Sequence, residues 1–351
     1  MASLRGHLIL QPRSRWGDRV FVRWATRVIH RSLIKDLYLT SIDAAVALAA
    51  HLTKIPRNHI CLPRGKRTQA FEKGRVMDST AIETDWQLRS LTLKRLTSQA
   101  TPDRSVALGS SPVPRVLVQY WDEREVPDDV TKCLASWGSL ESRGFTRLLF
   151  DRHRGRNFIL HAHGDEHAAA FDAAPHPAAR SDYFRLCYLA VQGGWYVDAD
   201  DQFQDVDIGP LLAPRGLRVQ ALCYDIDAGK TIEPSAALRG DDTRNVIHYV
   251  NNNPIITRPG HPIITEALHI ATTTLNHHTR TPGMQFDIQA TAGPGLLTLT
   301  IARYGLKSPL TSKEIDVEIR TDWDVFAQPV WDLNYRRSGY DWRSWDGLRA
   351  L

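Results

Sequence analysis

The chain has 351 residues, of which 42% are hydrophobic and 24% charged, a composition typical of a globular protein with one large domain or one domain and an appendage. It contains no uncharged apolar run of about 18 residues, which argues against a membrane-spanning helix, and no apolar segment with a cleavage site opens it. Its four cysteines form no CxxC pair, so we predict neither a zinc site nor a disulfide framework and expect a cytoplasmic protein.

Charge is unevenly distributed along the chain. Residues 1–110 hold 19 Lys and Arg against 8 Asp and Glu, whereas the remainder holds 25 against 31. Basic residues recur at every fourth position between Arg19 and Lys35, with apolar residues among them. This pattern predicts a basic amphipathic helix within a mainly helical region at 1–97. The helix either packs on the rest of the protein with a solvated face, the favoured interpretation, or contacts an anionic membrane surface. No base-reading module follows it, so nucleic acid is not an expected partner.

The remaining elements follow in chain order. Residues 98–112 are rich in Ser, Pro and Gly, which predicts a linker, and residues 113–351 are expected to form one α/β domain. Predicted strands lie at 115–121, 145–151, 195–200, 217–225 and 246–250, and predicted helices at 127–137, 154–172, 178–191, 262–275 and 293–305. The alternation of strands with helices predicts a mostly parallel central sheet.

An acidic cluster ends the third predicted strand. Asp198 and Asp200 are two residues apart, so in strand geometry both side chains point to one face at the carboxyl end, where open α/β sheets bind ligands. Two carboxylates there suit Mn²⁺ or Mg²⁺ and, through the ion, a diphosphate. A solvated acidic turn is the competing interpretation of the pair alone. Asp201 is either a further metal ligand or a solvated bystander, and the second is favoured.

The helix before this strand carries a second polar pair. Asp182 and Arg185 are three residues apart, so they share a helix face that leads to the same strand end. Such a pair either binds a ribose hydroxyl and an anionic phosphate or forms a weak salt bridge within the helix.

The combined pattern is more specific than its parts. The segment RSDYFRLCYLAVQGGWYVDAD at 180–200 resembles the DXD region of glycosyltransferase family 32 and its relatives. These include capsular-polysaccharide sugar transferases, fungal mannosyltransferases and clostridial glucosylating toxins. The elements that carry the resemblance are Ser181, Asp182, Arg185, Gly193, Gly194, Trp195, Tyr196, Asp198 and Asp200. Segments 113–123, 251–268, 291–298 and, more loosely, 341–345 are also similar to the family, so the resemblance extends from 112 to 345.

The resemblance implies a GT-A-like fold and a metal-dependent transfer that retains the anomeric configuration. The implied donor is a UDP- or GDP-linked sugar, and the acceptor is a saccharide, a lipid-linked saccharide or a protein. Asp200 would bind Mn²⁺ or Mg²⁺ directly, with help from Asp198, Ser344 and Asp341. The implied catalytic residues are Asp182, Arg185, Asp198 and Asp200, and no enzymic nucleophile is assigned. The implied donor-binding residues are Trp121, which would stack on the base, with Asp182, Arg185, Tyr196, Asp198, Trp345 and one of Asn251 and Asn252.

Two other classes of protein remain open at this point. A phosphatase of the haloacid-dehalogenase type also has Asp-x-Asp after an apolar strand, and GDD at 240–242 would be its later metal motif. That class expects Thr or Val where this chain has Gln202, and it does not account for Asp182 and Arg185. The second alternative is a non-catalytic binding protein that acts through the basic N-terminal region.

Overall fold

The computed structural model describes residues 86–98, 112–212, 216–239, 244–279, 286–307, 315–337, 341–343 and 345. The basic helix predicted between Arg19 and Lys35 and most of the predicted linker lie outside the described residues. So do Ser344 and the GDD segment at 240–242. Among the helices that the structure does describe, none is long and apolar enough to cross a bilayer.

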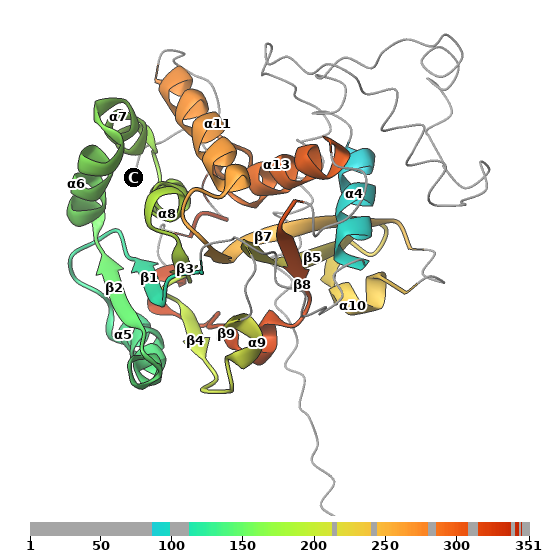
Figure 1. The fold of residues 1–351 in the computed structure, drawn as a ribbon, viewed down its shortest axis with the longest axis horizontal. Coiled ribbons are helices and arrows are strands. Elements are labelled where there is room, and N and C mark those ends of the chain that lie inside the picture. Colours follow the sequence, from blue (N-terminus) through green and yellow to red (C-terminus); the bar gives the residue numbers. More distant parts are fainter. Residues whose placement is uncertain are drawn as a thin grey trace, which may run out of the picture.

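A seven-stranded sheet forms the centre of the fold (Figure 1). Its strands run in the order β2-β1-β3-β7-β5-β6, with β8 also paired to β5. Only β7 and β6 run opposite to the other five strands, so the predicted mostly parallel sheet is confirmed. The strands are β1 Val116–Tyr120, β2 Thr146–Phe150, β3 Gly194–Tyr196, β5 Leu217–Asp225, β6 Lys230–Ile232, β7 Val246–Thr257 and β8 Val317–Arg320.

Both faces of the sheet are covered, because apolar side chains alternate between them along the strands. Val118 belongs to one core cluster and its neighbour Leu117 to the other, and Ile255 and Ile256 divide in the same way. The helices that contribute to the first cluster are α4 Trp86–Ser98, α6 Arg152–His163, α7 Asp165–Ala173, α8 Pro177–Gln192, α11 Pro262–His278, α12 Ile288–Thr291 and α13 Pro294–Lys307.

The opposite face is covered by shorter elements (Figure 1). A two-stranded sheet pairs β4 Asp201–Phe203 with β9 Ala327–Pro329. Trp137, Phe203 and Trp323 pack together there in the second core cluster. The remaining elements are α5 Asp128–Ser136, η2 Trp137–Arg143, α9 Gly209–Leu212, α10 Pro234–Ala237, η3 Trp323–Val325 and η4 Asn334–Arg337.

Most predicted elements are confirmed, but some differ in extent. The single helix predicted at 154–172 is two helices, α6 and α7, separated at Gly164, whose φ of 86° ends the first helix. The predicted strand 246–250 continues to Thr257. Helix α4 precedes the predicted linker, yet it is bonded to the sheet: Ser90 Oγ donates to the Val246 carbonyl (3.3 Å) and accepts from the His248 amide (2.8 Å).

Two glycines allow the chain to turn from α8 into β3. Gly193 has a φ of 62°, and a Cβ there would lie 2.6 Å from the backbone nitrogen of Pro259. Gly194 has a φ of 106°, and its Cβ would lie 2.8 Å from the Val116 carbonyl oxygen. Both positions combine a left-handed conformation with close backbone contact, so only glycine fits. The Gly-Gly pair therefore brings the end of α8 directly against the sheet.

His261 gives the fold a dependence on pH. This residue precedes α11 and is fully buried. Burial and the nearby Arg258 lower the pKa of His261 to about 4, below its value of about 6.5 in an unfolded chain. Its neutral form therefore stabilises the fold above about pH 6.5, and that stabilisation, up to about 3 kcal/mol, is lost as the pH falls towards 4.

We expect His261→Asn to reduce the change in the free energy of unfolding between pH 7 and pH 4.5, measured by urea denaturation at both values. His153→Asn is the control, because His153 is exposed and its replacement should leave the pH dependence as in the wild type. Equal pH dependence in the wild type and His261→Asn would contradict this assignment.

Candidate active site

The candidate active site lies at the carboxyl ends of two neighbouring parallel strands. Strand β1 lies between β2 and β3, so the chain leaves β1 towards one side and returns on the other. Such a reversal opens a crevice beyond the carboxyl ends of the two strands, where α/β proteins bind ligands. Trp121 follows β1 and Asp198 follows β3 by two residues. The Gln119 side-chain amide donates to the Asp198 carbonyl oxygen (3.4 Å), which links the two strand ends.

The strand predicted at 195–200 is shorter than expected. β3 ends at Tyr196, and the residues from Asp198 to Asp201 form a turn in which the Asp201 amide donates to the Asp198 carbonyl oxygen (3.2 Å). The prediction that Asp198 and Asp200 share one strand face is therefore wrong, because strand geometry does not continue this far. Instead, each of the three aspartates makes its own set of contacts.

Asp198 joins the helix pair in one hydrogen-bonded network. The Nη2 atom of Arg185 lies 2.9 Å from Asp182 Oδ1 and 2.9 Å from Asp198 Oδ1. Asn252 on β7 donates through its side-chain amide to Asp182 (2.8 Å), and its carbonyl oxygen accepts from Arg185 Nη1 (2.6 Å). The predicted residues Asp182, Arg185, Asp198 and Asn252 thus meet, and the pair on α8 is more than an isolated intrahelical salt bridge.

Tyr196 packs against the Arg185 side chain of this network. Its ring lies 4.2 Å from the guanidinium carbon of Arg185, and its hydroxyl is hydrogen-bonded to Ser181 Oγ (2.7 Å). Tyr196 is fully buried and packs against the guanidinium of Arg185. A direct contact of Tyr196 with the donor stays a prediction.

Negative charge is concentrated in this network. Burial raises the pKa of Asp182 to about 6, against the opposing effect of Arg185. Burial also raises the pKa of Asp198, again opposed by Arg185 and reinforced by Asp200. Burial alone would lower the pKa of Arg185, but Asp198, Tyr196 and Asp182 raise it. Asp198 has the most accessible of the three side chains, about one-third exposed against 10% for Asp182 and 4% for Arg185, so it is the carboxylate that faces solvent.

Asp200 belongs to a different set of contacts. Its Oδ2 atom accepts a hydrogen bond from the Tyr335 hydroxyl (2.6 Å) and another from the Arg336 guanidinium. Both partners lie on η4, far along the chain. The backbone of the segment before η4 also contacts the turn: the Val330 amide donates to the Asp200 carbonyl oxygen (2.9 Å). Neither Tyr335 nor Arg336 is among the predicted site residues, since no local pattern relates them to the acidic turn.

Asp201 is buried, with 2% of its surface exposed, which corrects the prediction of a solvated bystander. Its Oδ2 atom accepts from the Asn253 side-chain amide (3.0 Å), and its carbonyl oxygen accepts from the Trp137 indole (2.9 Å). Asn253 also accepts from the Asp198 amide (3.0 Å). Burial raises the pKa of Asp201 well above its usual range, and the charges of Asp200 and Asp198 raise it further. Asn253, the third residue of an Asn run, thus bonds to both ends of the turn. It was not among the predicted site residues.

Trp121 lies beside the acidic turn. Its half-buried ring packs in one cluster with Ala199, the middle residue of Asp-x-Asp, and meets Tyr335 edge to face at 5.1 Å. Its indole nitrogen is buried and has no hydrogen-bond partner among the described residues. Asn251, the alternative to Asn252, is half-buried and lies outside the network that Asn252 joins.

The C-terminal residues of the predicted site lie near α8. Trp345 is half-buried and packs against His176 and Phe286, with ring centroids 5.1 and 6.0 Å apart. Asp341 accepts from the amide of Arg343 (3.1 Å) and from its guanidinium (3.2 Å). The role of Asp341 as a metal ligand stays a prediction. Ser344 lies outside the described residues, so its metal-binding role stays a prediction.

The residues of the turn fit a divalent cation. Four carboxylates gather at and beside the turn, from Asp182, Asp198, Asp200 and Asp201. Among the described residues, the arginines paired with them are Arg185 and Arg336. Carboxylate oxygens are the ligands that Mg²⁺ and Mn²⁺ prefer. No group of three or more His, Cys, Asp or Glu side chains suited to a metal occurs within the described part of the chain.

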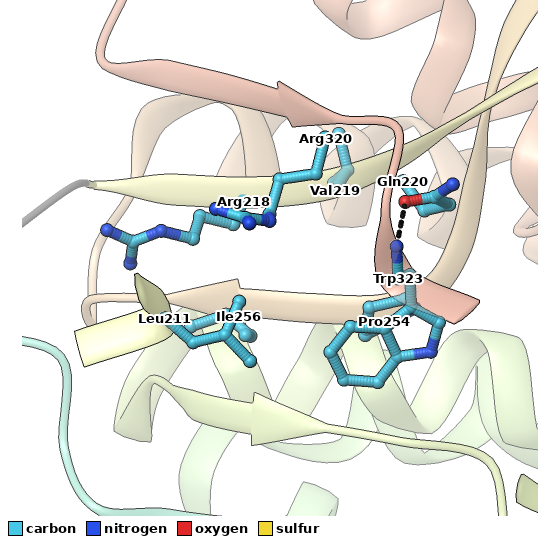
Figure 2. A pocket seen from close by; sticks show the side chains of 8 residues that line it. All are labelled: Leu211, Arg218, Val219, Gln220, Pro254, Ile256, Arg320 and Trp323. Atoms are coloured by element: carbon cyan, nitrogen blue, oxygen red, sulfur yellow. Dashed lines mark hydrogen bonds between the residues drawn. The ribbon is translucent and has the colours of Figure 1, made fainter. Parts of the chain in front are cut away.

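A separate narrow pocket lies between β5 and β7 and contains none of these carboxylates (Figure 2). Its walls are mainly apolar, and Gln220 Oε1 accepts from the Trp323 amide at its edge (3.1 Å). Arg218 and Arg320 also line it, but both guanidinium groups are bonded to Glu318 (2.8 Å each). Both arginines of the pocket are therefore already paired with a carboxylate, and the pocket contributes nothing further to the candidate site.

Comparison with known proteins identifies the class of protein. Residues 127–206 match the family model described as a glycosyltransferase sugar-binding region containing a DXD motif. Among solved structures, the chain is similar to one titled PaToxG Glycosyltransferase, with 16% identity over 75% of this chain and 95% of that chain and a TM-score of 0.39. No curated protein sequence matches the chain.

The matched segment contains α8, Gly193–Gly194 and the acidic turn with its Asp198-x-Asp200 motif. The protein is therefore a glycosyltransferase, and the resemblance to DXD sugar transferases found in the sequence is confirmed. Enzymes with this region typically use a divalent metal ion. The match sets aside the phosphatase and the non-catalytic binding protein.

Proposed function

We propose that the protein is a metal-dependent, retaining glycosyltransferase that moves a sugar from a UDP- or GDP-linked donor to a saccharide, lipid-linked or protein acceptor. The observation that carries the proposal is the network of Asp182, Arg185 and Asp198 at the carboxyl end of β3, inside the segment matched by the family. Retention of the anomeric configuration rests on the resemblance to family 32.

Each side chain has a part in the proposed reaction. Asp198 and Asp200, with Asp341 and Ser344, would hold Mn²⁺ or Mg²⁺. A bound metal ion supplies positive charge that stabilises the diphosphate leaving group as the glycosidic bond breaks. Arg185 holds Asp198 and Asp182 in fixed orientations, so that the more exposed Asp198 is presented to the donor. Trp121 would stack on the base, and Asn252 would contact the sugar or hold Asp182 in place.

Hydrolysis of nucleotide sugars tests this function directly, with water as the acceptor. The full-length protein is incubated with a panel of UDP- and GDP-sugars and Mn²⁺, and the released sugar is followed by proton NMR. We expect one donor class to be cleaved, with the first-formed sugar in the same anomeric configuration as in the donor. Release of the opposite anomer would contradict the retaining mechanism, and cleavage of no donor would contradict the transferase assignment.

Trp121→Ala is expected to weaken binding of the nucleotide about tenfold or more, because loss of an aromatic stacking partner costs roughly 1–3 kcal/mol per base. Manganese-dependent nucleotide affinity, measured by calorimetry, checks this. Trp86→Ala is the control, since Trp86 is also half-buried but packs in a different cluster, with Tyr224 and Tyr249. Unchanged affinity of Trp121→Ala for every nucleotide tested would remove Trp121 from the base site.

The proposed membrane contact of the basic N-terminal region is a separate matter. It rests only on the charge pattern between Arg19 and Lys35. We propose that the protein is cytoplasmic and that this region binds the inner face of the membrane peripherally. A lipid-linked acceptor would give such a contact a role, because it would hold the enzyme near its substrate.

A further inference from the structure

Arg336 holds Asp200 with only part of its donor capacity. Its Nη2 atom donates to Asp200, while its Nε atom is buried and has no hydrogen-bond partner among the described residues. The guanidinium lies over the rings of Trp331 and Tyr335, with its central carbon 5.0 and 5.2 Å from their centroids. The side chain is 12% exposed. A buried donor without a partner is costly, so the structure retains an arginine edge that is ready to bind a second group.

That edge suits a phosphate. The Nε and Nη2 atoms of one guanidinium donate in parallel, which matches the spacing of two oxygens on a phosphate. The carboxylate of Asp200 uses only one of these donors, since its Oδ2 atom is shared with the Tyr335 hydroxyl. A diphosphate accepting from both donors would satisfy the guanidinium more fully than Asp200 does.

A divalent cation and Arg336 compete for the same carboxylate. Both carry positive charge, and repulsion between charges a few ångströms apart is strong at a site that is largely withdrawn from water. Asp200 has 14% of its side chain exposed, so water screens the repulsion only weakly. Binding of a cation at Asp200 therefore favours release of Arg336 from that carboxylate.

We propose that Arg336 is a diphosphate-binding residue that exchanges partners: it leaves Asp200 when a divalent cation binds there, and donates through Nε and Nη2 to the diphosphate of the donor. This inference rests on the proposed function. In it, cation and nucleotide binding are coupled, because the nucleotide gives the displaced guanidinium a new partner. Arg336 thereby discriminates a nucleoside diphosphate from a nucleoside.

The test is calorimetry on the full chain with Mn²⁺ alone, and with UDP, GDP, uridine and guanosine at saturating Mn²⁺. Arg336→Gln removes the competing charge, so we expect it to bind Mn²⁺ alone about tenfold more tightly than the wild type. It should bind the nucleoside diphosphate about tenfold more weakly, because one charge-assisted bidentate contact is lost. Affinity for the nucleoside should be unchanged.

Two further variants make the result specific. Arg337→Gln changes the neighbouring arginine of η4, which is exposed and paired with Asp332, and should match the wild type in every titration. Arg336→Lys keeps the charge but lacks the planar fork. It should bind Mn²⁺ like the wild type and the diphosphate more weakly, and it decides the question if Arg336→Gln does not fold.

Tighter binding of Mn²⁺ together with weaker binding of the nucleoside diphosphate distinguishes this role of Arg336 from a structural one. Weaker binding of both Mn²⁺ and the diphosphate by Arg336→Gln, or wild-type affinity for both, would overturn the exchange while leaving the transferase assignment intact. If the wild type itself binds no nucleotide in the presence of Mn²⁺, the proposed function fails and this inference fails with it.

Discussion

Asp200→Asn is expected to slow the release of nucleoside diphosphate from the nucleotide sugar by about 100- to 1,000-fold, comparable to the loss of a group that stabilises charge in the transition state. The amide cannot supply the negative charge that holds a divalent cation. It can still accept the hydrogen bond that the Tyr335 hydroxyl donates to Asp200 in the wild type (2.6 Å). The turn should therefore keep its shape. The measurement is the initial rate at saturating Mn²⁺ and donor.

Asp205→Asn is the matched control for that rate. Asp205 lies five residues further along, is exposed and pairs with Arg143, and its φ of 51° is one that asparagine also adopts. Its replacement should leave the rate as in the wild type. A rate for Asp200→Asn within about threefold of the wild type would mean that Asp200 does not hold the cation that stabilises the leaving group.

The largest expected effect on stability comes from Arg185→Met. Arg185 is 3% exposed and is bonded to Asp182 and to Asp198. Removing the guanidinium leaves these carboxylates without their shared counter-charge in a largely buried place, which typically costs about 3–5 kcal/mol. Methionine fills a similar volume, so the loss reflects charge rather than a cavity. The free energy of unfolding from urea denaturation at pH 7 measures it.

Arg156→Met provides the comparison for this loss. Arg156 forms an ion pair of similar length with Asp172 (2.7 Å), but both side chains are about 40% exposed. Because water screens such a pair, its loss is expected to change the free energy of unfolding by less than about 1 kcal/mol. If Arg185→Met costs no more than Arg156→Met, the network around Arg185 is not the electrostatic centre described above.

Local sequence patterns located the first half of the site. Gly193 and Gly194 marked the turn from helix to strand, and the spacing of Asp182 and Arg185 put both on one helix face, as the structure shows. These are contacts within about 20 residues, where helix periodicity and glycine geometry determine which side chains meet. The same reasoning extended β3 too far, because the length of a strand depends on its partners. β3 pairs with β1 at Leu117 and Val118 and goes no further than Tyr196.

Contacts between distant segments could not be predicted in this way. The asparagine run after Val250 is typical of a loop by its polarity, yet it continues β7, because Asn252 and Asn253 find partners in Asp182 and Asp201. Arg336 and Tyr335 approach Asp200 from more than 130 residues away. Only the tertiary fold brings such groups together, and an arginine in a charged segment gives no sign of its partner.

Nucleotide binding measured by calorimetry, with and without Mn²⁺, tests the central claim most directly. The panel comprises UDP, GDP and their sugar conjugates, titrated into the wild type and into Asp200→Asn. A DXD sugar transferase should bind one nucleotide class in a Mn²⁺-dependent manner, and the Asp200→Asn protein should lose that dependence. Failure of the folded wild-type protein to bind any nucleotide, or equal binding in the absence of Mn²⁺, would contradict a metal-dependent donor site at Asp198 and Asp200.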